Sequence, residues 1–204
     1  MDKHYLTPLF SPQSIAVFAG PVDEPAQLTS HARALVEALR IEHCGAKLQF
    51  FDINASATLS DLAHARSDLA VIALPVQDIA SALEVAGRMS CGAALVVSTG
   101  VNAEKAAEFK AIARREGMHL LGPNSLGLQR PSLKLNASAA GPLAKAGPLA
   151  LVSQSGALTS AMLDWASKNA VGFSSVVSLG PHTVVDLAQV LDFLASDAQT
   201  HSII

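Results

Sequence analysis

Short apolar runs alternate with longer amphipathic segments along the first 130 residues of the chain. The apolar runs predict buried strands at 14–19, 47–51, 69–74, 93–98 and 119–121. Between them, apolar residues recur every three or four positions and predict helices at 29–40, 76–89 and 104–116. Such an alternation is typical of a parallel sheet with right-handed crossovers. We therefore predict an α/β fold with a Rossmann-like, doubly wound parallel sheet.

The alternation stops between Gln129 and Pro148, where prolines, glycines and small residues are frequent. Because such clusters favour turns, we interpret residues 131–147 as a linker between domains. Beyond it, the pattern predicts strands at 149–153 and 173–178, helices at 156–169 and 185–196, and the beginning of a strand at 202–204. We thus expect a first domain at 1–130 and the start of a second, incomplete α/β domain at 148–204.

The composition excludes several classes of protein. Half of the 204 residues are hydrophobic but only 4% are aromatic, so the apolar positions are mainly Ala, Val, Leu and Ile, as in buried parallel strands. A formal net charge of −3 gives no basic surface for nucleic acid. No apolar stretch has the length of a membrane span, and no signal-peptide pattern is present. Isolated Cys44 and Cys91 predict two free thiols in a cytoplasmic protein.

The turn Ser153-Gln154-Ser155-Gly156 joins a predicted strand to a predicted helix. Small residues leave its backbone N–H groups accessible, and the positive end of the helix dipole lies beside them. The hydroxyl groups of Ser153 and Ser155 are further donors. We interpret this turn as a binding site for a phosphate or another anion. The alternative is that Ser155 serves only as the N-cap of the helix.

In an open parallel sheet, ligands bind beyond the carboxyl ends of the strands. The loops that follow the predicted strands begin at Gly20, Asp52, Leu74, Ser98 and Gly122. They contain small residues, hydroxyls and an amide, which suit a ligand that contains a nucleotide. They contain no nucleophile beside a base, no carboxylate pair and no cluster of metal ligands. We therefore expect the first domain to bind a ligand without catalysing a reaction of its own.

The first of these loops, Ala19–Pro25, lacks the G-x-G-x-x-G pattern of dinucleotide-binding folds. Its two prolines remove N–H donors, and Asp23 and Glu24 would repel a phosphate. Asp52, at the end of the second strand, is either a solvated turn residue or an acceptor for a ribose hydroxyl. An NAD-binding redox sensor therefore stays an alternative that rests on Asp52 and the fold alone.

Two residues of the second domain invite a functional interpretation and are better explained structurally. Trp165 lies on a predicted helix, and we expect it in the core. His182 follows a predicted strand without a visible carboxylate partner, so we expect a structural or solvated side chain.

Six short segments, each weak alone, occur in an order that indicates a family. They are Leu9–Val17 (LFSPQSIAV), Asp68–Pro75 (DLAVIALP), Leu121–Gly127 (LGPNSLG), Leu135–Ser138 (LNAS), Ser153–Leu158 (SQSGAL) and Gly172–Ser174 (GFS). Together they resemble the NDP-forming acyl-CoA synthetase family, which includes relatives of the succinyl-CoA synthetase α subunit. The chain is also similar to the synthetase-like part of bacterial protein lysine acetyltransferases.

The resemblance implies a CoA-binding domain at 1–130 and part of a flavodoxin-like domain at 148–204. It implies that CoA or acyl-CoA is bound by Gly20, Asn54, Leu74, Pro75, Ser98, Thr99, Gly100, Asn124 and Ser125. In the family, the helix after the turn at 153–156 faces a phosphate carried by a catalytic histidine, which agrees with an anion site there. No catalytic or metal-binding residue is expected within this chain, and ATP, ADP and Mg would belong to the full-length parent.

Two departures from the family pattern keep two functions open. The first loop keeps only one glycine, Gly20, and Gly180-Pro181-His182-Thr183-Val184 stands where the family has Gly-Asn-x-Ala-Asp. The first hypothesis is the CoA-binding part of an ADP-forming acyl-CoA synthetase. The alternative is a non-catalytic module that senses acetyl-CoA in a protein lysine acetyltransferase. The expected partners are a CoA ligand and the other domains of the parent, with a homo-oligomer as a further alternative.

Overall fold

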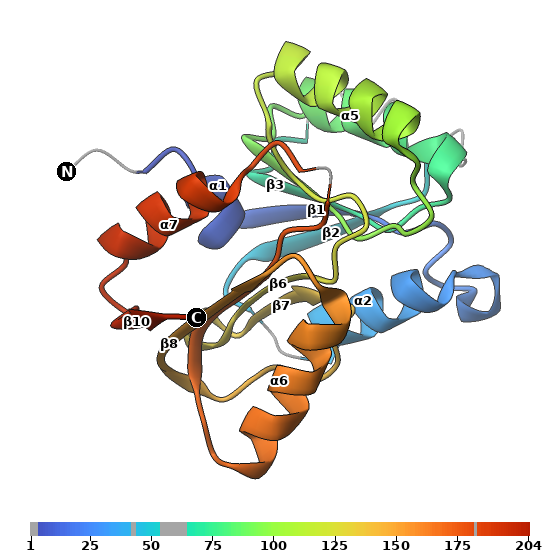
Figure 1. Cartoon of the computed structure of the whole chain (residues 1–204). Helices are drawn as coiled ribbons and strands as arrows, with labels where there is room; N and C mark the ends of the chain where they lie inside the picture. Colours follow the sequence, from blue (N-terminus) through green and yellow to red (C-terminus); the bar gives the residue numbers. More distant parts are fainter. Residues whose placement is uncertain (1–3, 42–43, 54–64, 182) are drawn as a thin grey trace.

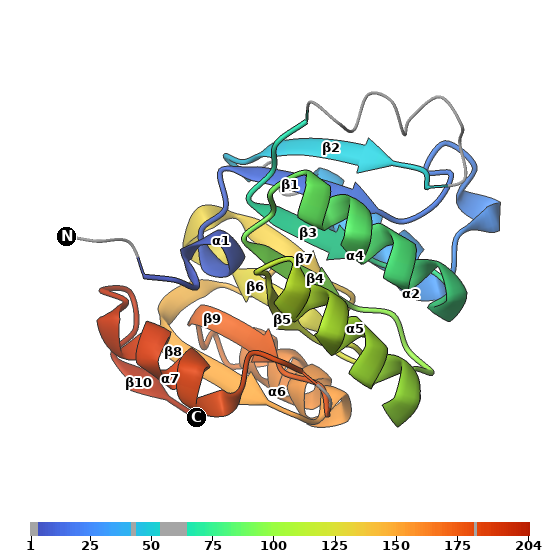
Figure 2. The same ribbon diagram turned by 90° about the horizontal axis from the view of Figure 1, so that it is seen from above.

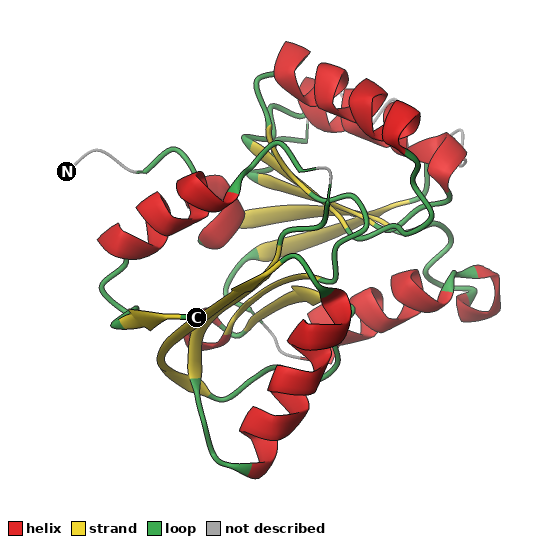
Figure 3. Cartoon of the chain, viewed as in Figure 1, coloured by secondary structure: helices red, strands yellow, loops and turns green. Residues whose placement is uncertain are grey.

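The computed structural model describes residues 4–41, 44–53, 65–181 and 183–204, and within them the strands form two five-stranded sheets (Figure 1). Sheet A has the order β2-β1-β3-β4-β5 and contains β1 (Ser14–Phe18), β2 (Lys47–Phe51), β3 (Leu69–Ile72), β4 (Ala93–Val96) and β5 (His119–Leu121). Sheet B has the order β10-β8-β9-β6-β7 and contains β6 (Gly127–Arg130), β7 (Leu135–Ser138), β8 (Ala146–Ser153), β9 (Phe173–Ser178) and β10 (Ser202–Ile203). The α-helices are α1 (Thr7–Phe10), α2 (Ser30–Ile41), α4 (Ile79–Arg88), α5 (Ala103–Arg115), α6 (Gly156–Lys168) and α7 (Leu187–Ser196), and Figure 3 shows them around the two sheets.

Sheet A is the predicted parallel, doubly wound sheet, and each of its neighbouring strand pairs is parallel. Alternate residues of β1 face opposite sides of the sheet. Ala16 and Phe18 pack with α4 and α5, whereas Ile15 and Val17 pack with α2 and with apolar residues of sheet B. Figures 1 and 2 show α4 and α5 side by side on one face and sheet B on the other. Because β1, β3 and β4 are covered on both faces, they are almost continuous apolar runs, and the hydrophobic pattern located them. Strand β2, at the edge of the sheet, is only partly buried.

Sheet B corrects the expectation of a linker at residues 131–147. That segment contains a 3-10 turn at Pro131–Leu133, strand β7 and the first residues of β8. Strand β6 pairs antiparallel with β7 and with β9, so this hairpin is part of the second sheet.

The hairpin escaped prediction because its buried residues are partly polar. Gln129 and Ser138 are buried, and the Gln129 Nε2 donates to Ser138 Oγ at 3.1 Å. Ser138 Oγ in turn donates to the Asn136 Oδ1 at 2.6 Å. Buried polar groups that bond one another avoid the penalty of desolvation, but they remove the apolar signal from the sequence.

The other differences from the predicted elements are small, apart from two. The short helix α1 has no counterpart among the predictions. Trp165 is 51% exposed on α6, so its expected place in the core is wrong. Helix α6 buries Thr159 and Ala166 instead, because its inward face carries the small residues.

A buried arginine joins α1, β6 and α7 at the end of the molecule away from the carboxyl ends of sheet A. The Arg130 Nη2 donates to Asp197 Oδ1 at 3.2 Å, and its guanidinium lies 5.9 Å from the Phe10 ring centre and 5.6 Å from that of Phe193. The two phenyl rings stack at 4.0 Å. These contacts hold α7 against the N-terminal helix. No helix of the described residues is both long and apolar enough to cross a membrane.

Candidate functional site

Three loops at the carboxyl edge of sheet A come together at residues 74–75, 98–101 and 122–126, which we name the sheet A rim. Ser98 Oγ donates to Leu74 O at 2.7 Å, and Asn124 N donates to Ser98 O at 3.0 Å. The first bond connects the loop after β4 to the loop after β3, and the second connects the loop after β5 to the loop after β4. The structure thus brings together Leu74, Ser98 and Asn124, all of which were predicted as site residues. Pro75 is exposed beside them.

The turn from Ser98 to Val101 presents backbone donors to solvent. Thr99 and Gly100 are exposed, and among the described residues their N–H groups have no hydrogen-bond partner. Gly100 has φ = 77°, and a Cβ added to it would have no atom within 4 Å. Open space and free N–H groups suit an acceptor-rich ligand.

Ser125 differs from its expected role because its side chain faces the protein. It is 1% exposed, donates to Ser178 O and accepts from Gly127 N at 2.9 Å. The Ser178 hydroxyl accepts from Leu126 N at 3.0 Å. Ser125 therefore joins the sheet A rim to the end of β9, and its buried hydroxyl uses its only donor within the protein.

The predicted anion site lies at the N-terminus of α6, in residues 153–156, which we name the α6 turn. Ser155 is the N-cap, with its Oγ accepting from Leu158 N at 3.2 Å. Ser153 Oγ accepts from Ser155 N at 3.0 Å. Gln154 and Ser155 are exposed. The N-cap alternative is therefore confirmed as a structural role, and anion binding by the same turn stays a prediction.

The α6 turn and the sheet A rim are neighbours. A Cβ added to Gly156 would lie 3.2 Å from Leu126 Cγ, and Leu179 N donates to Ser153 O at 2.9 Å. Gly180 has φ = 73°, and a Cβ there would collide with Pro123 O. These close contacts between sequence-distant loops were missed by sequence reasoning, because no local pattern encodes them.

The remaining predicted residues lie in the loops after β1 and β2 or outside the described residues. Gly20 is buried at the end of β1 with φ = 89°, and its loop exposes Asp23 and Glu24. The predictions for Asn54 and His182 fall outside the described residues. Asp52 is half-buried after β2. Within the described ranges, no group of three or more His, Cys, Asp or Glu could hold a metal ion.

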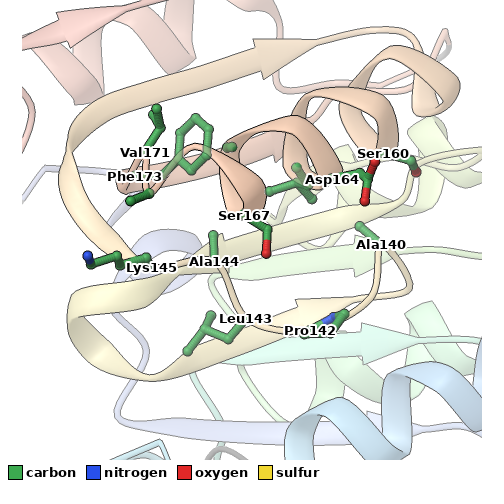
Figure 4. A pocket seen from close by; sticks show the side chains of 13 residues that line it. Ala140, Pro142, Leu143, Ala144, Lys145, Ser160, Asp164, Ser167, Val171 and Phe173 are labelled. Atoms are coloured by element: carbon green, nitrogen blue, oxygen red, sulfur yellow. The ribbon is translucent and has the colours of Figure 1, made fainter.

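A separate cavity of about 490 Å³ lies between α6 and the loop that precedes β8 (Figure 4). Ser160, Asp164 and Ser167 of α6 face Pro142 and Leu143 across it. No residue of the sheet A rim or of the α6 turn lines this cavity.

The chain is similar to a family model and to curated proteins. The family model described as succinyl-CoA ligase like flavodoxin domain matches residues 146–204. The ADP-forming acetate–CoA ligase I of Archaeoglobus fulgidus is 37% identical over 143 residues, which are 67% of this chain and 21% of that protein. The alpha subunit of the ADP-forming acetate–CoA ligase I of Pyrococcus furiosus is 36% identical over 67% of this chain and 31% of the subunit.

A solved structure supports the assignment over almost the whole chain. The dinucleotide-forming acetyl-coenzyme A synthetase 1 of Ca. Korarchaeum cryptofilum, in complex with phosphate and ADP, superposes with a TM-score of 0.87 at 28% identity. The match covers 97% of this chain and 44% of that one. The chain thus spans about a fifth to a third of the curated relatives described above. On its fold, its ordered motifs and these relatives, the chain belongs to the NDP-forming acyl-CoA synthetase family.

Proposed function

We propose that the chain is the CoA- or acyl-CoA-binding part of an ADP-forming acyl-CoA synthetase. In the whole protein, acyl-CoA, ADP and phosphate would be converted to acid, CoA and ATP, and the reverse. The observation that carries the proposal is the contact between the sheet A rim and the α6 turn, through Gly156 and Leu126. The thiol arm of a ligand bound on the rim would then lie beside an anion bound at the N-terminus of α6.

The backbone donors of the sheet A rim and the α6 turn suit CoA, whereas the acidic residues of the first loop do not. CoA has phosphate and amide oxygens, which accept bonds from N–H groups such as those of Thr99 and Gly100. In the first turn of α6 the Leu158 N–H is taken by Ser155 Oγ, but the N–H groups of Gly156 and Ala157 have no partner among the described residues and can receive an anion. Asp23 and Glu24, exposed beside Gly20, would repel a phosphate in the first loop. We therefore propose that affinity depends mainly on the sheet A rim.

Calorimetric titration with CoA, acetyl-CoA and NAD in parallel tests the proposal. We expect heat of binding from CoA or acetyl-CoA and none from NAD. Gly100→Asp places a carboxylate on the rim and should weaken CoA binding at least tenfold. Gly117→Asp is the matched control, since Gly117 has φ = 71° against 77° for Gly100 and also has open space around it. The proposal is contradicted if neither CoA nor acetyl-CoA gives heat of binding, or if the two variants bind CoA with equal affinity.

The acidic first loop favours a second candidate, a module that senses acetyl-CoA without ligase chemistry. It predicts CoA or acetyl-CoA binding in a parent protein that forms no ATP from acetyl-CoA, ADP and phosphate. A coupled assay for ATP on the full-length parent distinguishes the two. For the full-length parent we also propose binding sites for ATP and Mg, further domains or subunits, and a cytoplasmic location. A homo-oligomer is a further alternative.

A further inference from the structure

Asn124 lies on the sheet A rim, yet its side-chain amide is bonded to the protein. Its Nδ2 donates to Val101 O at 2.8 Å, and its Oδ1 accepts from Val101 N at 3.2 Å. Its backbone N–H donates to Ser98 O at 3.0 Å. Both ends of the Ser98–Val101 turn are therefore fastened to a single residue of the neighbouring loop.

The residue type is suited to this position for two reasons. Asn124 has φ = 55°, in the left-handed region that glycine and asparagine adopt more readily than other residues. Its amide carries a donor and an acceptor on one short, planar group, so it can pair with the N–H and the C=O of the same residue. An alanine would lose both bonds and be strained at this φ.

What the fastened turn offers to a ligand is its backbone. Thr99 and Gly100 lie between the two fastened ends, and they are the exposed residues of the turn. Because their N–H groups have no partner among the described residues, they are available to acceptor oxygens. A loop that is ordered before binding loses less conformational entropy on binding, which raises affinity.

We infer that Asn124 is a positioning residue: it fixes the Ser98–Val101 turn so that the N–H groups of Thr99 and Gly100 receive acceptor oxygens of CoA. Asn124 itself does not contact the ligand. This inference rests on the proposed CoA site, and it changes the role expected for Asn124 from direct contact to support of the turn.

Three variants separate positioning from folding. Asn124→Gly removes both amide bonds but tolerates the positive φ. Asn124→Asp keeps an acceptor for Val101 N–H and loses the donor to Val101 O. Asn102→Gly is the matched control, because the Asn102 side chain caps α5 by accepting from Lys105 N at 2.9 Å and makes no bond to the turn. CoA affinity is measured by calorimetry, and amide exchange at Val101 by NMR.

For Asn124→Gly we expect an about tenfold higher Kd for CoA and at least tenfold faster exchange of the Val101 amide. Exchange should rise less in Asn124→Asp, and Asn102→Gly should leave Kd unchanged. The inference is overturned if Asn124→Gly binds CoA as tightly as the unsubstituted chain, or if Val101 exchange is unaltered. If the unsubstituted chain binds no CoA, the proposed function fails and this inference fails with it.

Discussion

Replacement of Gly180 by alanine tests the junction between the sheet A rim and the end of β9. Gly180 has φ = 73°, and an added Cβ would collide with Pro123 O and lie 3.1 Å from Asn124 O. The left-handed backbone alone costs an alanine about 1–2 kcal/mol. Forced displacement of a packed loop adds about 1–3 kcal/mol. We therefore expect Gly180→Ala to lower the free energy of unfolding by about 2–5 kcal/mol.

Gly117→Ala separates the two contributions. Gly117 has φ = 71°, close to that of Gly180, but a Cβ added to it would have no atom within 4 Å. It should therefore lose only the backbone part, about 1–2 kcal/mol. Urea unfolding followed by circular dichroism gives both values, and CoA titration should show weaker binding for Gly180→Ala alone. Equal destabilisation by the two variants would refute the claim that the loops meet at Gly180.

Three further predictions concern other parts of the molecule. Asp197→Ala leaves the Arg130 guanidinium buried without its ion-pair partner and should cost about 3–5 kcal/mol in urea unfolding, whereas a loss below about 1 kcal/mol would contradict a buried pair. Burial, and to a lesser extent Asp68, raise the pKa of the Cys91 thiol to about 12, so at pH 8 a thiol reagent should modify half-exposed Cys44 quickly and Cys91 only after unfolding. Ser155→Ala removes the α6 N-cap and should cost about 1 kcal/mol; calorimetry should also show weaker phosphate binding, and unchanged affinity would argue against an anion site there.

Sequence patterns located sheet A well and sheet B only in part. Strands β1, β3 and β4 of sheet A are almost completely buried, so their short apolar runs indicate buried parallel strands. Strands β6 and β7 are also buried, but Gln129, Asn136 and Ser138 bond one another there. A polar network of this kind is indistinguishable in sequence from a solvated loop.

The proximity of three residues of the sheet A rim was predictable from the sequence, and the bonds that their polar groups make were not. Parallel strands place their following loops on one edge, so the proximity of Leu74, Ser98 and Asn124 follows from topology. Their bonds do not, because each joins loops more than 20 residues apart, as Asn124 and Val101 show with a separation of 23. Only the folded chain reveals that these polar groups bond to one another.

That use of side chains changes which substitutions should matter for ligand binding. The polar groups of Asn124, Ser125 and Ser178 form bonds between loops. Thr99 and Gln154 are exposed, and their side chains form no such bond to any residue that the structure describes. If the ligand is held by backbone N–H groups, substitution of the exposed side chains should leave its affinity unchanged. Substitution of the residues that bond the loops together should lower it. A surface of this kind recognises acceptor oxygens through the shape of its backbone. Its affinity then depends on how firmly the loops after β4, β5 and β9 are held together.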